Sequence, residues 1–392
     1  MQFIECRKYK RETVVSAFGM INSFLSLRLK RMPKILFIAA HRLNRSPSQR
    51  YRFEQYFEFL KGKGYECELS SLIREVDDNY FYSPGHLFKK FLFTVKSAVT
   101  RWNDVRRANN FDIIFIQREA FMTGSTFFEK RFSRSKAKLI YDFDDSIWIM
   151  DTSNANKKWE WMKSTKKTGE IISLSNLVFA GNQFLFDYAK KFNQNVVIIP
   201  TTIDTKIFQR KQDYKNNEKI CIGWSGSITT IKHFEEASGI LKKIKQKYGD
   251  KVYFKVMGDD TYKNIELNIN GLPWTSETEI EIISSFDIGI MPLPDDQWVK
   301  GKCGLKGLSY MSLEVPTIMS AIGVNTEIIT DGVNGYLANS EEEWVHKISQ
   351  LVESFELRKK LGLQGRKTVV ESYSFDSQKN NYLNSFNDLL KR

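Results

Sequence analysis

The sequence predicts an α/β protein made of two Rossmann-like domains that face each other across a cleft. Short apolar runs alternate with longer amphipathic stretches, a pattern typical of βα units around a parallel sheet. The pattern occurs twice in tandem, and 392 residues with 42% hydrophobic residues suffice for two cores. Because open parallel sheets bind ligands beyond the carboxyl ends of their strands, we expect the functional site in the cleft.

The first series of elements spans residues 33–200 and is predicted to form the N-terminal domain. Six short apolar runs are predicted strands: Lys34–Ala40, Cys67–Leu72, Asp112–Gln117, Leu139–Phe143, Leu177–Ala180 and Val196–Ile199. A helix is expected over Tyr51–Lys63, because Gly64 supplies a stop. Residues 1–32 are predicted to be an N-terminal appendage, since they precede the first strand and lack the cleavage site of a signal peptide.

A polar, basic stretch over Pro200–Asn217 is predicted to link this domain to a second one, residues 201–373. The strands expected there are Lys219–Trp224, Val252–Met257, Asp287–Met291 and Thr317–Ser320. The helices expected between them are Ile231–Lys247 and Gly307–Leu313. Helical periodicity continues from Glu341, and we expect a last helix at about residues 374–392 to cross back to the first domain.

Charge and composition narrow the class of partner. The net charge of +13 favours nucleic acid, an anionic membrane or a phosphorylated small molecule. Four scattered cysteines and only four histidines favour a reducing, cytoplasmic location and disfavour disulfides or a histidine-rich zinc site. The sequence contains no run of about 18 apolar residues, so no membrane-spanning helix is predicted.

A phosphate-binding turn is predicted in the second domain at IGWSGSITTIKHFEE, residues 222–236. Gly226 and Ser227 follow a strand and precede a helix, and Lys232 lies in the first turns of that helix. Small residues let the backbone approach a ligand, and helix amides with a nearby cation suit a phosphate. Taken alone, the pattern also fits an ordinary βα turn with a solvated lysine.

A more specific segment covers residues 286–337. A strand leads into a loop, GKCGLK, which carries Lys302 and Lys306, and the following helix holds Ser309 near its N-terminus. The dipole and free amides of that helix end favour a diphosphate. A basic surface loop beside a packed helix would not explain why glycine, lysine and cysteine crowd together here.

The segments GWSGS, FDIGIMPLPDDQW–GKCGLKGLSYM and GVNTEIITDGVNG resemble the nucleotide-sugar half of the retaining GT-B glycosyltransferases of the family 4 group. Within that group, the likeness is to enzymes of bacterial polysaccharide and cell-surface glycan synthesis. It implies a hexosyltransferase that moves a sugar from a nucleoside diphosphate sugar to a hydroxyl of a glycan or lipid-linked acceptor, with retention of configuration. The first domain would hold the acceptor and the second the donor, with no metal or other cofactor.

The resemblance also implies roles for individual residues. Lys306 would be catalytic, by stabilising the departing diphosphate. The donor-binding residues would be Gly226, Ser227, Lys232, Trp274, Lys302, Gly304, Leu305, Ser309 and Glu327. Many members carry two glutamates separated by seven residues, and Gly301 and Ser309 occupy those places here. Asp295, Asp296 and Glu327 are candidate substitutes.

Three carboxylates follow a predicted strand of the first domain in IYDFDDSIW. Asp144 and Asp145 are expected to be catalytic, since a carboxylate can accept a hydroxyl proton or stabilise a developing positive charge. The alternatives are an exposed acidic turn, a helix N-cap, or a metal-binding pair of Asp142 and Asp144. The residues expected to contact the acceptor or line the cleft are Arg50, Arg52, Arg118 and Asn182.

One helix is predicted over His86–Trp102, with an apolar stripe of Leu87, Phe91, Leu92, Val95, Ala98, Val99 and Trp102. A basic amphipathic helix of this kind can lie on an anionic membrane, here the inner face of the cell membrane. Alternatively, its apolar face packs on the sheet. For the whole chain, the alternatives are a GT-B-type nucleotide-sugar epimerase and a basic nucleic-acid-binding protein. Dispersed charge and the lack of an aromatic stacking motif disfavour the latter.

Overall fold

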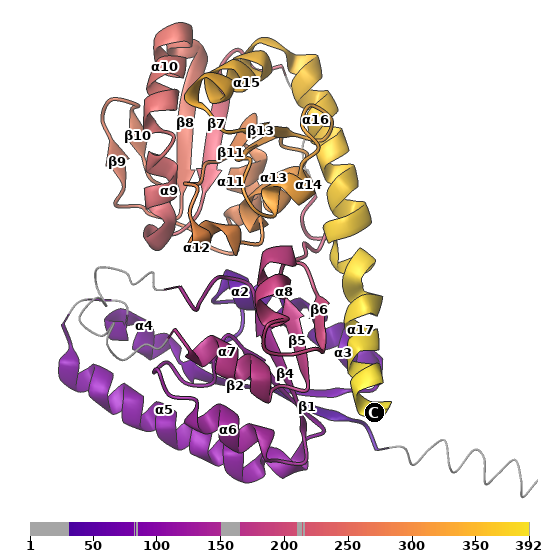
Figure 1. Ribbon diagram of the computed structural model, residues 1–392. Helices are drawn as coiled ribbons and strands as arrows, with labels where there is room; N and C mark the ends of the chain where they lie inside the picture. The colour runs from indigo at the N-terminus through magenta and orange to yellow at the C-terminus, as the bar shows by residue number, and fades with distance from the viewer. Residues whose placement is uncertain are drawn as a thin grey trace, which may run out of the picture.

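The computed structural model describes residues 31–81, 83, 85–149, 165–209, 214 and 216–391. The predicted N-terminal appendage therefore lies outside the described residues, apart from its last two. Two parallel sheets, each covered by helices, lie one above the other (Figure 1). This arrangement confirms the predicted class, an α/β chain with two Rossmann-like domains.

The N-terminal domain contains a six-stranded parallel sheet in the order β2-β1-β3-β4-β5-β6. Its strands are β1 (Lys34–His41), β2 (Glu66–Ile73), β3 (Ile113–Gln117), β4 (Lys138–Phe143), β5 (Leu177–Ala180) and β6 (Val196–Ile198). Strands β3 and β5 are buried along their whole length, as expected of apolar runs in a parallel sheet covered on both faces.

Helices connect these strands on both faces of the sheet. They are α2 (Pro47–Arg50), η1 (Glu54–Tyr56), α3 (Phe57–Gly62), α4 (Glu75–Phe81), α5 (Leu87–Arg107), η2 (Ala108–Asn110), α6 (Phe127–Ser133), α7 (Lys167–Leu174) and α8 (Gln183–Ala189). The single helix predicted over Tyr51–Lys63 is wrong in its first half, where a turn and η1 replace it. The reason is burial, because this turn carries Arg52 and Phe53 into the domain interior.

The C-terminal domain contains a five-stranded parallel sheet in the order β13-β12-β11-β7-β8 and a small antiparallel hairpin. The sheet strands are β7 (Ile220–Ser225), β8 (Val252–Met257), β11 (Ile288–Met291), β12 (Thr317–Ser320) and β13 (Tyr336–Ala338), and the hairpin strands are β9 (Lys263–Asn264) and β10 (Ile269–Asn270). Strand β13 and the hairpin were not predicted, because each is only two or three residues long.

The helices of this domain surround its sheet. They are η4 (Ile228–Thr230), α9 (Ile231–Glu235), α10 (Ser238–Tyr248), η5 (Gly249–Lys251), α11 (Glu279–Ser284), α12 (Gln297–Lys300), α13 (Leu305–Ser312), α14 (Asn325–Ile328), α15 (Glu341–Glu353) and α16 (Phe355–Thr368). The single helix predicted over Ile231–Lys247 is wrong, because the chain forms α9 and α10. Between them, the Ala237 N–H bonds to the Phe234 carbonyl only three residues back, which tightens the turn.

The chain crosses between the domains twice. The first crossing follows β6, where Ile203 and Phe208 are buried and Ile203 pairs with Ser374. The second passes through the short π-helical turn η6 (Val369–Tyr373) into α17 (Phe375–Lys391), which runs along the side of the N-terminal domain (Figure 1). Tyr382 of α17 stacks on Tyr56 of η1, so the end of the chain belongs to the N-terminal core.

Candidate active site

The loops after several strands of both sheets meet at the interface between the domains. Asn182 donates a hydrogen bond across this interface to the Lys302 carbonyl (3.0 Å), and the Cys303 thiol donates to the Asp144 carbonyl (3.3 Å). Ser146 donates to the Gln297 carbonyl (3.3 Å). The loop that carries GKCGLK therefore rests on the acidic turn and on the start of α8.

Asp144 and Asp145 of the acidic turn share one counter-ion. Arg118 Nε lies 2.9 Å from Asp144 Oδ1, and the same guanidinium bonds to Asp145. The side chains of the two aspartates are only 11% and 20% exposed, so the alternative of an exposed acidic turn is wrong. Burial raises the pKa of Asp144, and the neighbouring charge of Asp145 adds to this against the opposing effect of Arg118.

Arg52 and Asp142 form a buried ion pair next to this turn. Both side chains are almost fully buried, and Arg52 also donates to the Ile199 carbonyl. Arg52 was expected to contact the acceptor or line the cleft, but its guanidinium is buried in the N-terminal domain and joins β4 to the end of β6. The same pairing occupies Asp142, the first residue of the metal-binding alternative. Among the described residues, no three His, Cys, Asp or Glu side chains gather as a metal ion would require.

Three lysines of the C-terminal domain converge on His233 of α9. Burial and, to a smaller extent, the charges of Lys302, Lys306 and Lys232 together lower the pKa of His233 to about 4. Lys232 is exposed, whereas Lys302 lies 3.9 Å from Asp145 and faces the acidic turn. Sequence analysis missed His233, although its position directly after Lys232 in the predicted phosphate turn was an available signal.

Lys306 is the second residue of α13, and its ammonium lies 5.4 Å from the centre of the Trp224 ring. Burial lowers its pKa to about 7, and Lys302 contributes in the same direction. No carboxylate within ion-pair distance of Lys306 is found in the described part of the chain. The backbone N–H groups of Leu305, Lys306 and Gly307 likewise have no acceptor among the described residues, as expected of a first helical turn.

Glycines shape the backbone around these lysines. A Cβ at Gly226 would lie 2.0 Å from the Trp224 ring, and a Cβ at Gly258, whose φ is 123°, would lie 2.2 Å from the Gly226 carbonyl oxygen. Gly304, at φ 68°, begins α13 in the left-handed region that favours glycine. Ser227 is exposed and caps η4 in a capping box with Thr230. The backbone of the predicted phosphate turn and of the N-terminus of α13 therefore requires glycine at positions 226, 258 and 304.

Gly301 and Ser309 occupy the two positions at which the resemblance led us to look for glutamates, and neither has open space around it. A Cβ at Gly301 would lie 2.1 Å from the Ser146 hydroxyl, so no glutamate fits in this arrangement. Ser309 is buried, and its hydroxyl donates to the Leu305 carbonyl. Of the substitutes, Asp295 is exposed and paired with Lys300, and Asp296 caps α12.

Glu327 is the third candidate substitute. It is exposed on α14, which packs against Gly304 through Ile328. Partial desolvation of the carboxyl at this site raises the pKa of Glu327, and the charge of Asp187 in α8 acts in the same direction. Glu327 therefore stands between the start of α13 and the N-terminal domain.

Arg50 and Trp274 meet in a contact between the domains. Arg50 Nη1 lies 3.1 Å from Glu279 Oε2, and its guanidinium stacks 5.3 Å from the centre of the Trp274 ring. The Tyr51 hydroxyl lies 3.4 Å from the same Glu279 carboxylate. Arg50 was expected to contact the acceptor or line the cleft, and it lies between the domains, where its pair with Glu279 forms a latch that joins α2 to α11. Glu279 and Tyr51 were not recognised from the sequence.

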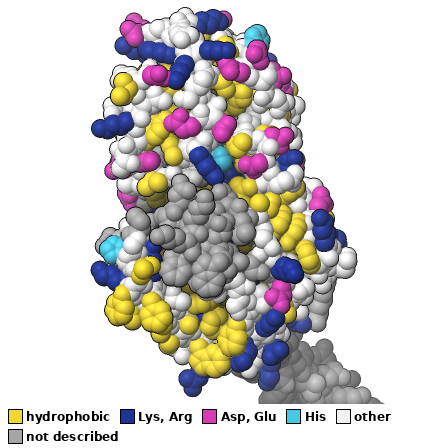
Figure 2. Space-filling model, turned by 60° about the vertical axis from the view of Figure 1, so that its left-hand side comes forward, with side chains coloured by type: hydrophobic (Ala, Val, Ile, Leu, Met, Phe, Trp, Pro, Cys, Tyr) yellow, Lys and Arg dark blue, Asp and Glu magenta, His cyan; other side chains and the backbone are white. Residues whose placement is uncertain are grey.

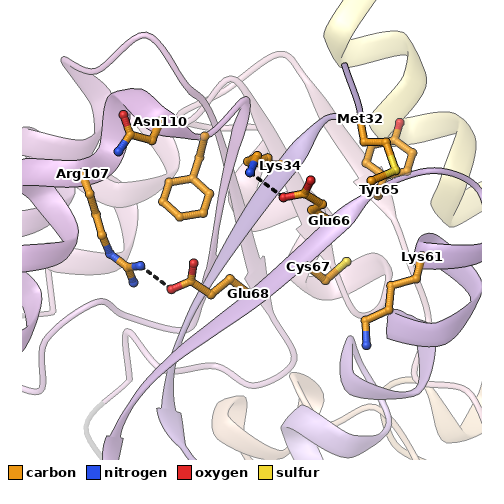
Figure 3. Close-up of a pocket in the computed structure, with 10 residues that line it drawn as sticks. Met32, Lys34, Lys61, Tyr65, Glu66, Cys67, Glu68, Arg107 and Asn110 are labelled. Carbon is orange, nitrogen blue, oxygen red and sulfur yellow. Dashed lines mark hydrogen bonds and ion pairs between the residues drawn. The ribbon is translucent and has the colours of Figure 1, made fainter. Parts of the chain in front are cut away.

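A surface hollow of about 830 Å³ lies away from this interface, at the amino ends of β1 and β2 (Figure 3). Its lining includes two ion pairs, Lys34 with Glu66 and Arg107 with Glu68. Ligands of open parallel sheets bind at the opposite, carboxyl ends of the strands. The charges of the hollow also neutralise one another in pairs, so we assign the functional site to the domain interface.

Similar folds are found among solved glycosyltransferases. The glycosyltransferase from Rickettsia africae ESF-5 is 16% identical, with a TM-score of 0.64 over 92% of this chain and 99% of that chain. Sucrose-phosphate synthase from Thermosynechococcus elongatus is 12% identical, with a TM-score of 0.66 over 92% and 99%. HepE of Anabaena, solved with UDP and glucose, is 12% identical, with a TM-score of 0.60 over 91% and 100%.

Sequence comparisons agree with the fold. Residues 219–354 match the family model for glycosyl transferases group 1. An uncharacterized 41.2 kDa protein in the cps region of Klebsiella pneumoniae is 24% identical over 263 residues, which is 63% of this chain and 70% of that protein. The chain thus has the fold of solved glycosyltransferases. The residues that match the family model lie in its C-terminal domain.

Proposed function

We propose that the enzyme transfers a hexose from a nucleoside diphosphate sugar to a hydroxyl of a glycan or lipid-linked acceptor, with retention of configuration. The anomeric carbon loses its bond to the diphosphate oxygen and gains one to the acceptor oxygen, whose proton departs. The relative in a cps region supports a role in polysaccharide synthesis. The HepE structure with UDP-glucose supports a nucleoside diphosphate sugar as the donor.

The desolvated ammonium of Lys306 carries this proposal. It lies beside three helix amides that have no acceptor in the described part of the chain, and the charge of Lys302 acts on it. Such a place disfavours an isolated positive charge and favours a dianion that compensates it. A departing diphosphate gains negative charge during the reaction, so these groups stabilise the transition state more than the ground state.

Asp144 and Asp145 face the lysines from the other domain. Lys302 reaches Asp145, and the raised pKa of Asp144 makes its carboxylate a better proton acceptor than an exposed one. We propose that this pair accepts the proton of the acceptor hydroxyl or stabilises positive charge on the sugar. In this proposal, the lysines neutralise the diphosphate without a metal, and an excess of chelator is expected to leave the rate unchanged.

We also propose that the enzyme works in the cytoplasm, at the inner face of the cell membrane. Cys67, Cys221 and Cys303 are free thiols, which fits a reducing compartment. None of the described helices is long and apolar enough to cross a membrane.

The test combines ligand binding with one substitution and a matched control. Nucleoside diphosphates should raise the melting temperature of the wild-type protein. Lys306→Ala is expected to lower kcat/KM about 10²- to 10³-fold, because one preorganised cation is lost. Lys243→Ala, on the outer helix α10 and paired with Glu341, should have no effect. Unchanged kinetics in Lys306→Ala would contradict the assignment, and conversion of donor without any acceptor would identify an epimerase instead.

A further inference from the structure

Helix α5 presents its apolar side to solvent and its polar side to the protein. Phe88 is 73% exposed and Phe91 63%, and the other exposed apolar residues of the helix are Leu87, Leu92, Val95, Val99 and Trp102. The inward side carries Phe93, Ser97, Arg101 and Asp104, all buried. The alternative that this stripe packs on the sheet is therefore wrong.

A buried arginine fixes this orientation. Arg101 is fully buried and donates to the carbonyls of Ala120 (2.6 Å) and Ala39 (2.7 Å). It also bonds to Ser70 and pairs with Asp104 at 3.0 Å. Rotating α5 to bury its apolar stripe would pull a charged pair out of a network that satisfies it. The exposed stripe is thus a consequence of how the helix is anchored.

The apolar face continues onto the start of α6. Phe127 is exposed and stacks on Trp102, with ring centres 6.1 Å apart. The Arg131 guanidinium lies 4.6 Å from the centre of the Phe127 ring. Figure 2 shows hydrophobic side chains gathered at the lower end of the molecule. We call the exposed residues Leu87, Phe88, Phe91, Leu92, Val95, Val99, Trp102 and Phe127 the α5 surface.

The exposed charges carried by α5 itself are positive. Lys89, Lys96 and Arg106 are exposed on the same helix, whereas the one carboxylate of α5, Asp104, is buried. A second copy of the chain would bring the same cations against these residues, which disfavours self-association. An anionic lipid surface complements both the apolar stripe and the flanking cations, because it has negative headgroups above an apolar layer.

We propose that the α5 surface docks the enzyme on an anionic lipid bilayer. The apolar side chains enter the boundary between headgroups and acyl chains, and the flanking cations contact lipid phosphates. Helix α5 lies along the outer side of the N-terminal domain, away from the C-terminal domain and from α17 (Figure 1). Docking by this surface leaves the C-terminal domain clear of the bilayer, where it remains free to bind a soluble donor.

Vesicle co-sedimentation tests the proposal without any need for turnover. The wild-type protein should bind vesicles that contain phosphatidylglycerol and not vesicles of phosphatidylcholine alone, and salt should weaken the binding. The double variant Phe88→Ser/Phe91→Ser is expected to bind at least about tenfold more weakly, because two inserted rings are lost. Lys89→Glu/Lys96→Glu should weaken binding by about tenfold or more. Ile265→Ser, which changes an apolar residue that is 94% exposed on the β9–β10 hairpin, is the matched control and should bind like wild type.

The outcomes separate this proposal from the proposed function. Melting temperatures of all variants should match the wild type, since every substituted side chain is exposed. Equal vesicle binding by the wild type and the Phe88/Phe91 variant would overturn the proposal. So would a wild-type dimer in analytical ultracentrifugation that the Phe88/Phe91 variant abolishes, because the surface would then serve self-association. Failure of nucleotide binding would refute the proposed function and leave the lipid result unaffected.

Discussion

The N-terminal side of the domain interface pairs its arginines with carboxylates: Arg52 with Asp142, Arg118 with Asp144 and Asp145, and Arg50 with Glu279. On the C-terminal side, the Lys306 ammonium lies beside an aromatic ring and other cations, and its pKa is lowered to about 7, chiefly by burial. Two sets of basic residues that look alike in the sequence thus stand in opposite electrostatic conditions.

Whether a basic side chain already has a carboxylate partner distinguishes residues with a structural role from candidates for binding an anionic ligand. A guanidinium that already has its carboxylate gains little from a phosphate and mainly holds elements in place. A desolvated ammonium among other cations is destabilised until an anion arrives. The comparison therefore supports scaffold roles for Arg50 and Arg52 and the proposed binding of a diphosphate by Lys306.

Breaking the buried pair on the N-terminal side should have the largest effect, and the effect should be on stability. Arg52→Ala leaves Asp142 as an uncompensated buried charge, which is expected to lower the free energy of unfolding by about 3–5 kcal/mol. Denaturant unfolding measures this. Lys61→Ala, which removes an exposed pair with Glu58, should leave stability unchanged. Equal losses in the two variants would mean that the buried pair has no special role.

On the C-terminal side of the interface, we expect the titration of Lys306 to make nucleotide binding depend on pH. A bound diphosphate raises the pKa of Lys306 from about 7, so binding takes up a proton above that pH. Affinity should then fall by up to about tenfold per pH unit from about pH 7 to about pH 9. His233 stays neutral throughout this range, since its pKa is about 4. Lys306→Arg keeps its charge and should flatten the profile, as measured by calorimetry. Parallel profiles for the two proteins would exclude Lys306 as the titrating group.

Substitutions in the latch formed by Arg50 and Glu279 should have the smallest effect, and the effect should be on donor binding. Arg50→Ala or Glu279→Gln removes a mostly buried ion pair that joins α2 to α11, and we expect this to weaken the contact between the domains by about 1 kcal/mol. We expect about a fivefold rise in the KM for the donor and a smaller change in kcat. The double variant should resemble either single variant, because both lose the same interaction. Additive effects in steady-state kinetics would show that the two residues act separately.

Much of the fold was predictable because it depends on local patterns. The strands Leu177–Ala180, Val252–Met257 and Thr317–Ser320 begin and end as predicted, since continuous apolar runs bounded by polar residues mark buried parallel strands. The acidic turn and the lysine loop were also recognisable, because both follow strands directly. Helix breaks were not, since those at Tyr51–Phe53 and at Glu236–Ala237 depend on short-range bonds and on burial that no periodicity reveals.

The sequence by itself determined which residue types stand at the ends of the strands and which stripe of α5 is apolar. Only the tertiary structure decided their partners. Arg50 and Arg52 are two residues apart, yet one meets Glu279, which is 229 positions away, and the other meets Asp142. The stripe of α5 fits a buried or an exposed helix equally well until the partners of Arg101 are known. The physical reason is that periodicity specifies a face, whereas long-range contacts determine what that face meets.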